Sequence, residues 1–110
     1  MSARRVLVVW INPLFRDSVL MLLKHPDVKC VGVIKSNEVV PDEISSMEPD
    51  TILVEEAEGH MSDEVMSVFE GPDFKGRLVS LSMGDNRLRV YHREEWAAVQ
   101  AEDLLHLILS

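Results

Sequence analysis

"RVLVVWINPLFRDSVLMLLKHP", Arg5 to Pro26, is the stretch of the sequence that decides the fold. Its first part, Arg5 to Ile11, is a continuous apolar and β-branched run, which is typical of a strand buried on both faces. Asn12 is then a good N-cap, and Pro13 suits the first position of a helix that Pro26 ends. The residues of this helix that are predicted to face the core are Phe15, Val19, Leu22 and Leu23.

The same alternation continues along the chain. Further strands are predicted at 28–34, 51–55 and 77–83, with a short helix at 41–47 and a third helix that Ser62 caps. Strands that alternate with helices imply right-handed crossovers and a parallel sheet covered on both sides. We therefore predict a three-layer α/β/α sandwich, with its sites at the carboxyl ends of the strands.

Composition limits the classes of function. The chain has 110 residues and a net charge of -8, which predicts a single domain over residues 1–110 and argues against nucleic-acid or anionic membrane surfaces. No apolar run approaches the ~18 residues of a membrane span. The single cysteine, Cys30, forms no internal disulfide, and a reducing cytoplasm fits best.

At this point the sequence resembles a family. The stretch from Arg5 to Val33 is similar to the opening of a response regulator receiver domain, of the type found in transcription regulators with helix-turn-helix output domains. The "NPLFR" and "EPDTILV" segments and the hydroxyl of Ser82 at the end of the fourth strand match that pattern, and "AEDLLHLIL" resembles the final receiver helix. The resemblance implies a flavodoxin-like fold and a role in two-component signalling.

The departures from the family concern its chemistry. A receiver needs an acidic pair that holds a divalent metal, an aspartate nucleophile, a hydroxyl and a lysine to neutralise developing charge. By the resemblance, the acidic pair falls on Trp10 and Ile11, and the nucleophile falls on Glu55. The lysine position falls near Ala97 or Ala98. We therefore expect a pseudo-receiver that is not an enzyme, is not phosphorylated and uses no metal or cofactor, with a degenerate pocket formed by Trp10, Ile11, Asn12 and Ser82.

Glu55 has several interpretations. It belongs to a solvated loop together with Glu56 and Glu58, or it imitates a phosphorylated aspartate by extending its charge toward Ser82. A metal site formed by Glu55, Glu58 and His60 is disfavoured, because the spacing matches no zinc or calcium loop. Trp10 in turn either plugs the space that the acidic residues leave or forms a hydrophobic floor for a small ligand.

After the fourth strand the pattern differs from that of a receiver. "GDN", 84–86, is a turn signal, and "RLRVYHR", 87–93, alternates as a half-exposed strand does. "EEWAAVQ" follows as another strand. We predict that an antiparallel hairpin replaces the receiver's helix 4 and that its edge supports a homodimer. The candidate interface residues are Arg87, Arg89, Tyr91, Arg93 and Trp96.

The leading function is thus that of a receiver-like signalling or adaptor protein that contacts another protein. If the chain is the whole protein, it has no output domain, and any output goes through protein contacts. The alternatives are a small-molecule sensor that uses the vacated pocket beside Trp10, and a weak phospho-acceptor that uses Glu55, Ser82 or Asp85.

Overall fold

The computed structural model of the chain describes residues 3–56, 62–71, 74, 76–82, 87–92, 95–100 and 108–109. Its helices are α1 (Pro13–Leu22), α2 (Pro41–Met47) and α3 (Asp63–Glu70), with a short 3-10 turn at Ser36–Glu38. The strands are β1 (Arg4–Trp10), β2 (Val28–Lys35), β3 (Thr51–Glu55), β4 (Arg77–Ser82), β5 (Arg87–His92) and β6 (Glu95–Gln100). In the described part of the chain, none of the helices has the length and apolar character needed to cross a membrane.

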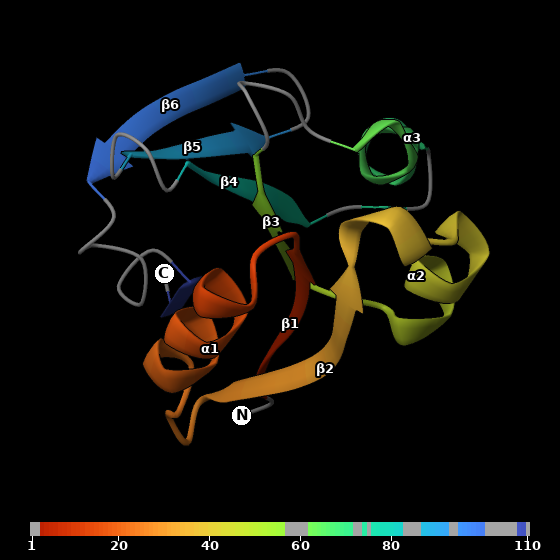
Figure 1. Ribbon diagram of the computed structural model, residues 1–110. Helices are drawn as coiled ribbons and strands as arrows, with labels where there is room; N and C mark the ends of the chain where they lie inside the picture. The colour runs from red at the N-terminus through yellow and green to blue at the C-terminus, as the bar shows by residue number, and fades with distance from the viewer. Residues whose placement is uncertain are drawn as a thin grey trace.

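The six strands form one mixed sheet in the order β2-β1-β3-β4-β5-β6 (Figure 1). β1 pairs in parallel with β2 and β3, and β3 pairs in parallel with β4. β5 then pairs antiparallel with β4, and β6 pairs antiparallel with β5. Because the chain leaves β1 toward β2 on one side and reaches β3 on the other, the switch point in strand order lies between β1 and β3.

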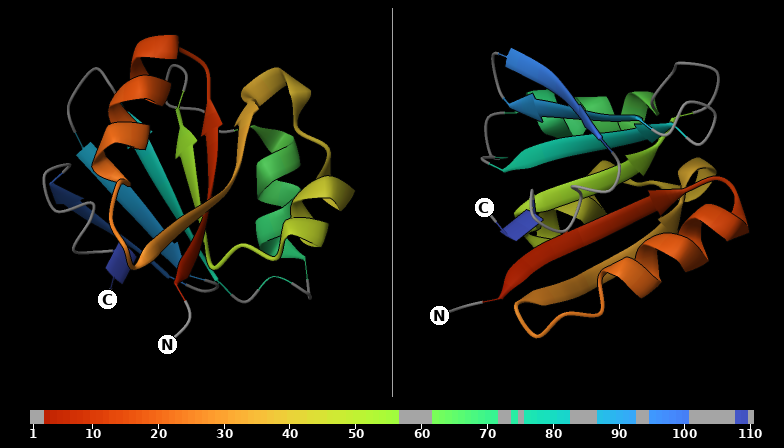
Figure 2. Two further views of the ribbon diagram at one scale, coloured as in Figure 1. Left: turned by 90° about the horizontal axis from the view of Figure 1, so that it is seen from below. Right: turned by 90° about the vertical axis from the view of Figure 1, so that its left-hand side faces the viewer.

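Helices cover both faces of the sheet. α1 lies on one face, and α2 and α3 lie on the other (Figure 2). Alternate β1 residues serve the two cores, since successive side chains of a strand point to opposite faces. Val6 and Val8 pack with the α1 residues Phe15 and Val19. The opposite core contains Leu7, Val9, Ile44, Val65 and Phe69. The predicted layered α/β architecture with a parallel sheet is therefore confirmed.

The local signals for the helices are largely confirmed. Asn12 is the N-cap of α1, Pro13 is its first residue, and the Ser62 hydroxyl caps α3. α1 ends at Leu22, before Pro26, because the backbone of Leu23 leaves helical geometry, with φ of -84° and ψ of 2°. The prediction that Leu22 faces the core is wrong: Phe15, Val19 and Leu23 fill the stripe, and Leu22 is about half exposed.

A carboxylate also closes the amino end of the β1–β3 pair. Asp50 Oδ2 accepts the Arg5 N–H at 2.9 Å, and the Asp50 N–H donates to the Arg5 carbonyl at 2.8 Å. The Arg5 guanidinium donates to the carbonyls of Met47 and Glu48, at the end of α2. Gly76 lies so close that a Cβ there would be 2.1 Å from the Asp50 oxygen. The proline-aspartate motif before β3 is therefore part of the scaffold.

Candidate functional site

The predicted site lies at the carboxyl ends of the parallel strands. β1 ends at Trp10, β3 ends at Glu55 and β4 ends at Ser82. Parallel pairing brings these ends to one edge of the sheet, beside the switch point between β1 and β3. The sequence reasoning thus assigned the residues to the correct edge, and their contacts decide what the edge can do.

Glu55 joins this edge to the turn before α1. Its Oε1 atom accepts the backbone N–H groups of Ile11 and Asn12, both at 2.9 Å. The residue is only 7% exposed. The interpretation of Glu55 as part of a solvated loop is therefore wrong, because the carboxylate is buried and holds two backbone donors that precede a helix. Of the two residues that take the place of the acidic pair, Ile11 contributes an N–H donor to the carboxylate, and Asn12 contributes the other donor.

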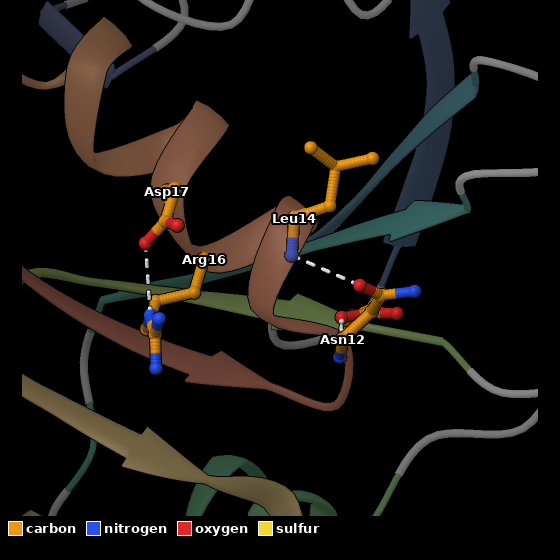
Figure 3. Close-up of polar contacts among 5 residues, drawn as sticks. Asn12, Leu14, Arg16 and Asp17 are labelled. Carbon is orange, nitrogen blue, oxygen red and sulfur yellow. Dashed lines mark hydrogen bonds and ion pairs between the residues drawn. The ribbon is translucent and has the colours of Figure 1, made fainter.

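Asn12 also stabilises the turn between β1 and α1. Asn12 Oδ1 accepts the Leu14 N–H at 2.9 Å, which satisfies one of the unpaired donors of the first helical turn (Figure 3). One turn later, Arg16 Nε lies 3.0 Å from Asp17 Oδ1 in an exposed ion pair. Asn12 and Glu55 therefore hold the β1–α1 turn from two sides.

Trp10 fills space on the α1 side of the sheet. Its indole is half buried and packs against the core cluster that contains Val8 and Phe15. The Arg16 guanidinium lies 4.7 Å from the ring centroid, and the Lys35 ammonium lies 5.7 Å from it. Both are within the range of cation–π attraction. An indole flanked by two cations stands where the resemblance places a metal-binding carboxylate.

Glu56 makes a contact that the sequence reasoning missed. Its Oε1 atom accepts the hydroxyl of Ser80, a residue that is buried in β4. The Glu56 N–H donates to the Leu81 carbonyl at 2.8 Å. Glu55 and Glu56 are adjacent in sequence, yet they contact different elements because one ends β3 and the other follows it. Only the β3–β4 register brings Ser80 near Glu56, so no local signal pointed to it.

The remaining candidate residues are placed by their backbone. Ser82 pairs with Arg87, Ser80 pairs with Arg89, and Tyr91 lies between Leu78 and Trp96. Arg93, Glu58, His60 and Asp85 lie outside the described residues. Among the residues that the structure describes, no three His, Cys, Asp or Glu side chains gather as a metal site would require.

A surface cavity of about 400 Å³ opens near the carboxyl end of β1. It is lined by Ile11, Lys35, Ser36, Asn37, Ser62 and Glu64. The Ser62 hydroxyl donates to Glu64 and thereby lowers the pKa of that carboxyl. Of the predicted pocket residues, Ile11 lines this cavity, whereas Trp10 and Glu55 do not.

Comparison with known proteins is informative about the fold alone. No family model and no curated protein matches the chain. A solved structure of a mutant of the anti-anti-sigma factor PhyR from Bartonella quintana is similar, with a TM-score of 0.52 and 16% sequence identity. The likeness covers 73% of this chain and 34% of that one, so the chain spans about a third of its structural neighbour. Together with the parallel β2-β1-β3-β4 arrangement, it supports a receiver-like α/β fold.

Proposed function

We propose that this chain is a receiver-like signalling or adaptor module that acts through contact with another protein and accepts no phosphoryl group. The observation that carries the proposal is the Glu55 carboxylate, which is buried and accepts the N–H groups of Ile11 and Asn12. A nucleophilic carboxylate must reach an incoming phosphorus atom, and phosphoryl transfer needs metal ions that neutralise its charge. Here the carboxylate is used to hold a turn.

The surroundings of Glu55 support the same conclusion. Trp10 and Ile11 carry no oxygen ligand on their side chains, and Mg²⁺ is bound in proteins by oxygen.

The similarity to PhyR is a likeness of fold. That protein is named as an anti-anti-sigma factor, and its name is compatible with our proposal that this chain also works by protein contact.

Intact-mass spectrometry after incubation with acetyl phosphate and Mg²⁺ tests the proposal. We expect no adduct on the natural chain, and none on a Glu55→Asp variant, because that change restores the usual acceptor without restoring the metal ligands. A stoichiometric phosphate adduct on Glu55 in the natural chain would contradict the proposal. The control for the reagent is a receiver domain that retains its acidic pair, which gains one phosphate under the same conditions.

A second candidate function is that of a small-molecule sensor, and the cavity at Ile11 is the observation that favours it. Its lining combines the Lys35 ammonium and the Glu64 carboxylate with the polar side chains of Ser36, Asn37 and Ser62. The cavity differs from the pocket beside Trp10 that the sequence suggested. A thermal-shift screen with small zwitterionic and anionic metabolites tests this function, and a stabilisation that Lys35→Met removes would support it.

The antiparallel strands give the proposed homodimer a definite edge. Among the strands that the structure describes, β6 is the last in the sheet order, so we place the candidate dimer edge on β6 rather than on β5. We propose that this hairpin replaces helix 4 of a receiver and that β6 pairs with a second copy. Light scattering after size exclusion measures the mass. A monomer at all concentrations would contradict the dimer, and Ala97→Pro and Ala98→Pro test the edge, since one of these N–H groups points away from β5.

A further inference from the structure

Two side-chain cations share one indole at the carboxyl end of β1. The Arg16 guanidinium lies 4.7 Å from the centroid of the Trp10 ring, and the Lys35 ammonium lies 5.7 Å from it. Three elements supply these residues, since Trp10 ends β1, Arg16 lies in α1 and Lys35 ends β2. Trp10 and Lys35 are register partners in the parallel β1–β2 pair, so their side chains leave the same face of the sheet. We call these three side chains the Trp10 cluster.

The positive charges of the Trp10 cluster are only partly neutralised by carboxylates. Asp17 Oδ1 lies 3.0 Å from Arg16 Nε in an exposed ion pair, and the two Nη groups of the guanidinium make no hydrogen bond to the described residues (Figure 3). Lys35 takes part in none of the ion pairs among the described residues. Glu55, which is buried at the same edge, bonds to backbone N–H groups instead. The cluster therefore has one unpaired cation and one cation whose partner is exposed to water.

Two like charges that share a ring repel each other. Cations at these distances from one centroid lie within about one Debye length of each other in ~0.1 M salt. An anion that contacts both of them removes this repulsion and gains charge-assisted hydrogen bonds. The indole attracts both side chains and restrains them before a ligand arrives, which reduces the entropy that they lose on binding. The Trp10 cluster is thus preorganised for an anion.

We infer that the Trp10 cluster is a binding site for a small phosphate or diphosphate anion. A guanidinium fork and a lysine ammonium are side-chain groups with which proteins bind phosphate oxygens. A phosphate group presents oxygen atoms in several directions, so it can contact both cations, whereas the two oxygens of a carboxylate are satisfied by one guanidinium. A planar aromatic ligand is disfavoured, because Arg16 and Lys35 already lie over the indole.

This site is independent of the proposed adaptor function and differs from the reaction site of a receiver. As the resemblance implies, a receiver holds a metal cation through carboxylates at this position and takes up a phosphoryl group covalently. The Trp10 cluster binds the anion through side-chain cations, without a metal and without a covalent bond. It is also distinct from the cavity at Ile11, because Lys35 lines that cavity and Trp10 and Arg16 do not.

Titration with pyrophosphate tests the inference through the fluorescence of Trp10. The chain has two tryptophans, so a Trp96→Phe background assigns the signal to Trp10. In EDTA and at constant ionic strength, we expect a saturable change up to about 10 mM pyrophosphate, because the anion changes the position of both cations on the ring. Acetate should give no saturable change. The absence of a saturable change with pyrophosphate, or an equal change with acetate, would overturn the inference.

Matched variants assign the binding to the two cations. Lys35→Met should weaken binding of pyrophosphate at least about fivefold, because it removes the ammonium and keeps an unbranched side chain. Lys29→Met is the control and should leave the affinity unchanged, since Lys29 pairs with Arg5 at the opposite end of β2. Asp17→Asn should tighten binding about threefold, because it frees the Arg16 guanidinium from its carboxylate. Equal losses from Lys35→Met and Lys29→Met would overturn the inference.

The remaining outcomes separate this site from the proposals above. Arg16→Gln should weaken binding of pyrophosphate and leave unchanged the affinity of any ligand of the cavity at Ile11, which Arg16 does not line. A pyrophosphate affinity that Arg16→Gln leaves unaltered, in a variant that circular dichroism shows to be folded, would overturn the inference and leave the adaptor function standing. A covalent phosphate adduct on Glu55 would contradict the proposed function and leave the reversible binding of pyrophosphate unaffected.

Discussion

Asp50 and Glu55 lie at the two ends of the same strand pair, and both accept backbone N–H groups from β1 or from the turn after it. At the amino end, Asp50 Oδ2 bonds to Arg5 and is exposed to solvent. At the carboxyl end, Glu55 Oε1 bonds to Ile11 and Asn12 and is buried. In a receiver the amino end is scaffold and the carboxyl end is the reaction site, as the resemblance implies. Here the carboxyl end has a scaffold function as well, and four substitutions test that comparison.

The largest effect is expected at the amino end, from Gly76→Ala. The new Cβ would lie 2.1 Å from the Asp50 oxygen and 2.7 Å from its carbonyl carbon, both of which are backbone atoms that cannot rotate away. The free energy of unfolding should fall by about 3 kcal/mol, as measured by denaturant titration. Gly71→Ala is the control: its nearest contact is 3.2 Å, and the loss should be under about 1 kcal/mol. Equal losses would contradict the close approach.

Glu55→Ala should be the next most costly change. It leaves the N–H groups of Ile11 and Asn12 without their acceptor and should lower the free energy of unfolding by about 2 kcal/mol. Glu55→Gln keeps an acceptor oxygen and should cost less than half as much. A silent Glu55→Ala would restore the solvated-loop interpretation. If partner affinity is unchanged by Glu55→Gln, the charge of Glu55 does not imitate a phosphorylated aspartate.

Asp50→Ala removes the matching carboxylate at the amino end. We expect a loss of about 1 kcal/mol, because only the Arg5 N–H loses an acceptor and this exposed donor can bond to water. The Asp50 backbone bonds to Arg5 and Arg77 remain in place. Comparing the denaturation midpoints of Asp50→Ala and Glu55→Ala measures the difference between the two ends. A larger loss from Asp50→Ala would show that Asp50, and not Glu55, contributes more to the stability of the fold.

The smallest effect is expected from Ser80→Ala, beside the carboxyl end. Ser80 loses its hydroxyl, and Glu56, which is half buried, turns toward water. The expected loss is about 0.5 kcal/mol, measured as a shift in denaturation midpoint. Ser80→Val separates hydrogen bonding from packing, since it fills the same buried position without a hydroxyl. A loss as large as that of Glu55→Ala would show that both glutamates at the end of β3 are needed for folding.

Local sequence determined the elements of the first half of the chain. The apolar run of β1, the cap at Asn12, Pro13 and Ser62 each act over a few residues, so their consequences can be deduced without knowing the fold. α2 at Pro41–Met47 and β3 at Thr51–Glu55 have the predicted bounds. The predicted strand ends also placed Trp10, Asn12 and Glu55 at one edge of the sheet.

Only the tertiary structure decided what the side chains at that edge do. Ile11 and Glu55, which are joined by a hydrogen bond, are 44 positions apart in the sequence, and Ser80 is 24 positions from Glu56. Partners at such distances depend on strand register, which propensity and spacing do not contain. The outward position of Leu22 was also decided by the tertiary structure. Both sides of α1 carry apolar residues, so the sequence alone does not determine which side packs against the sheet.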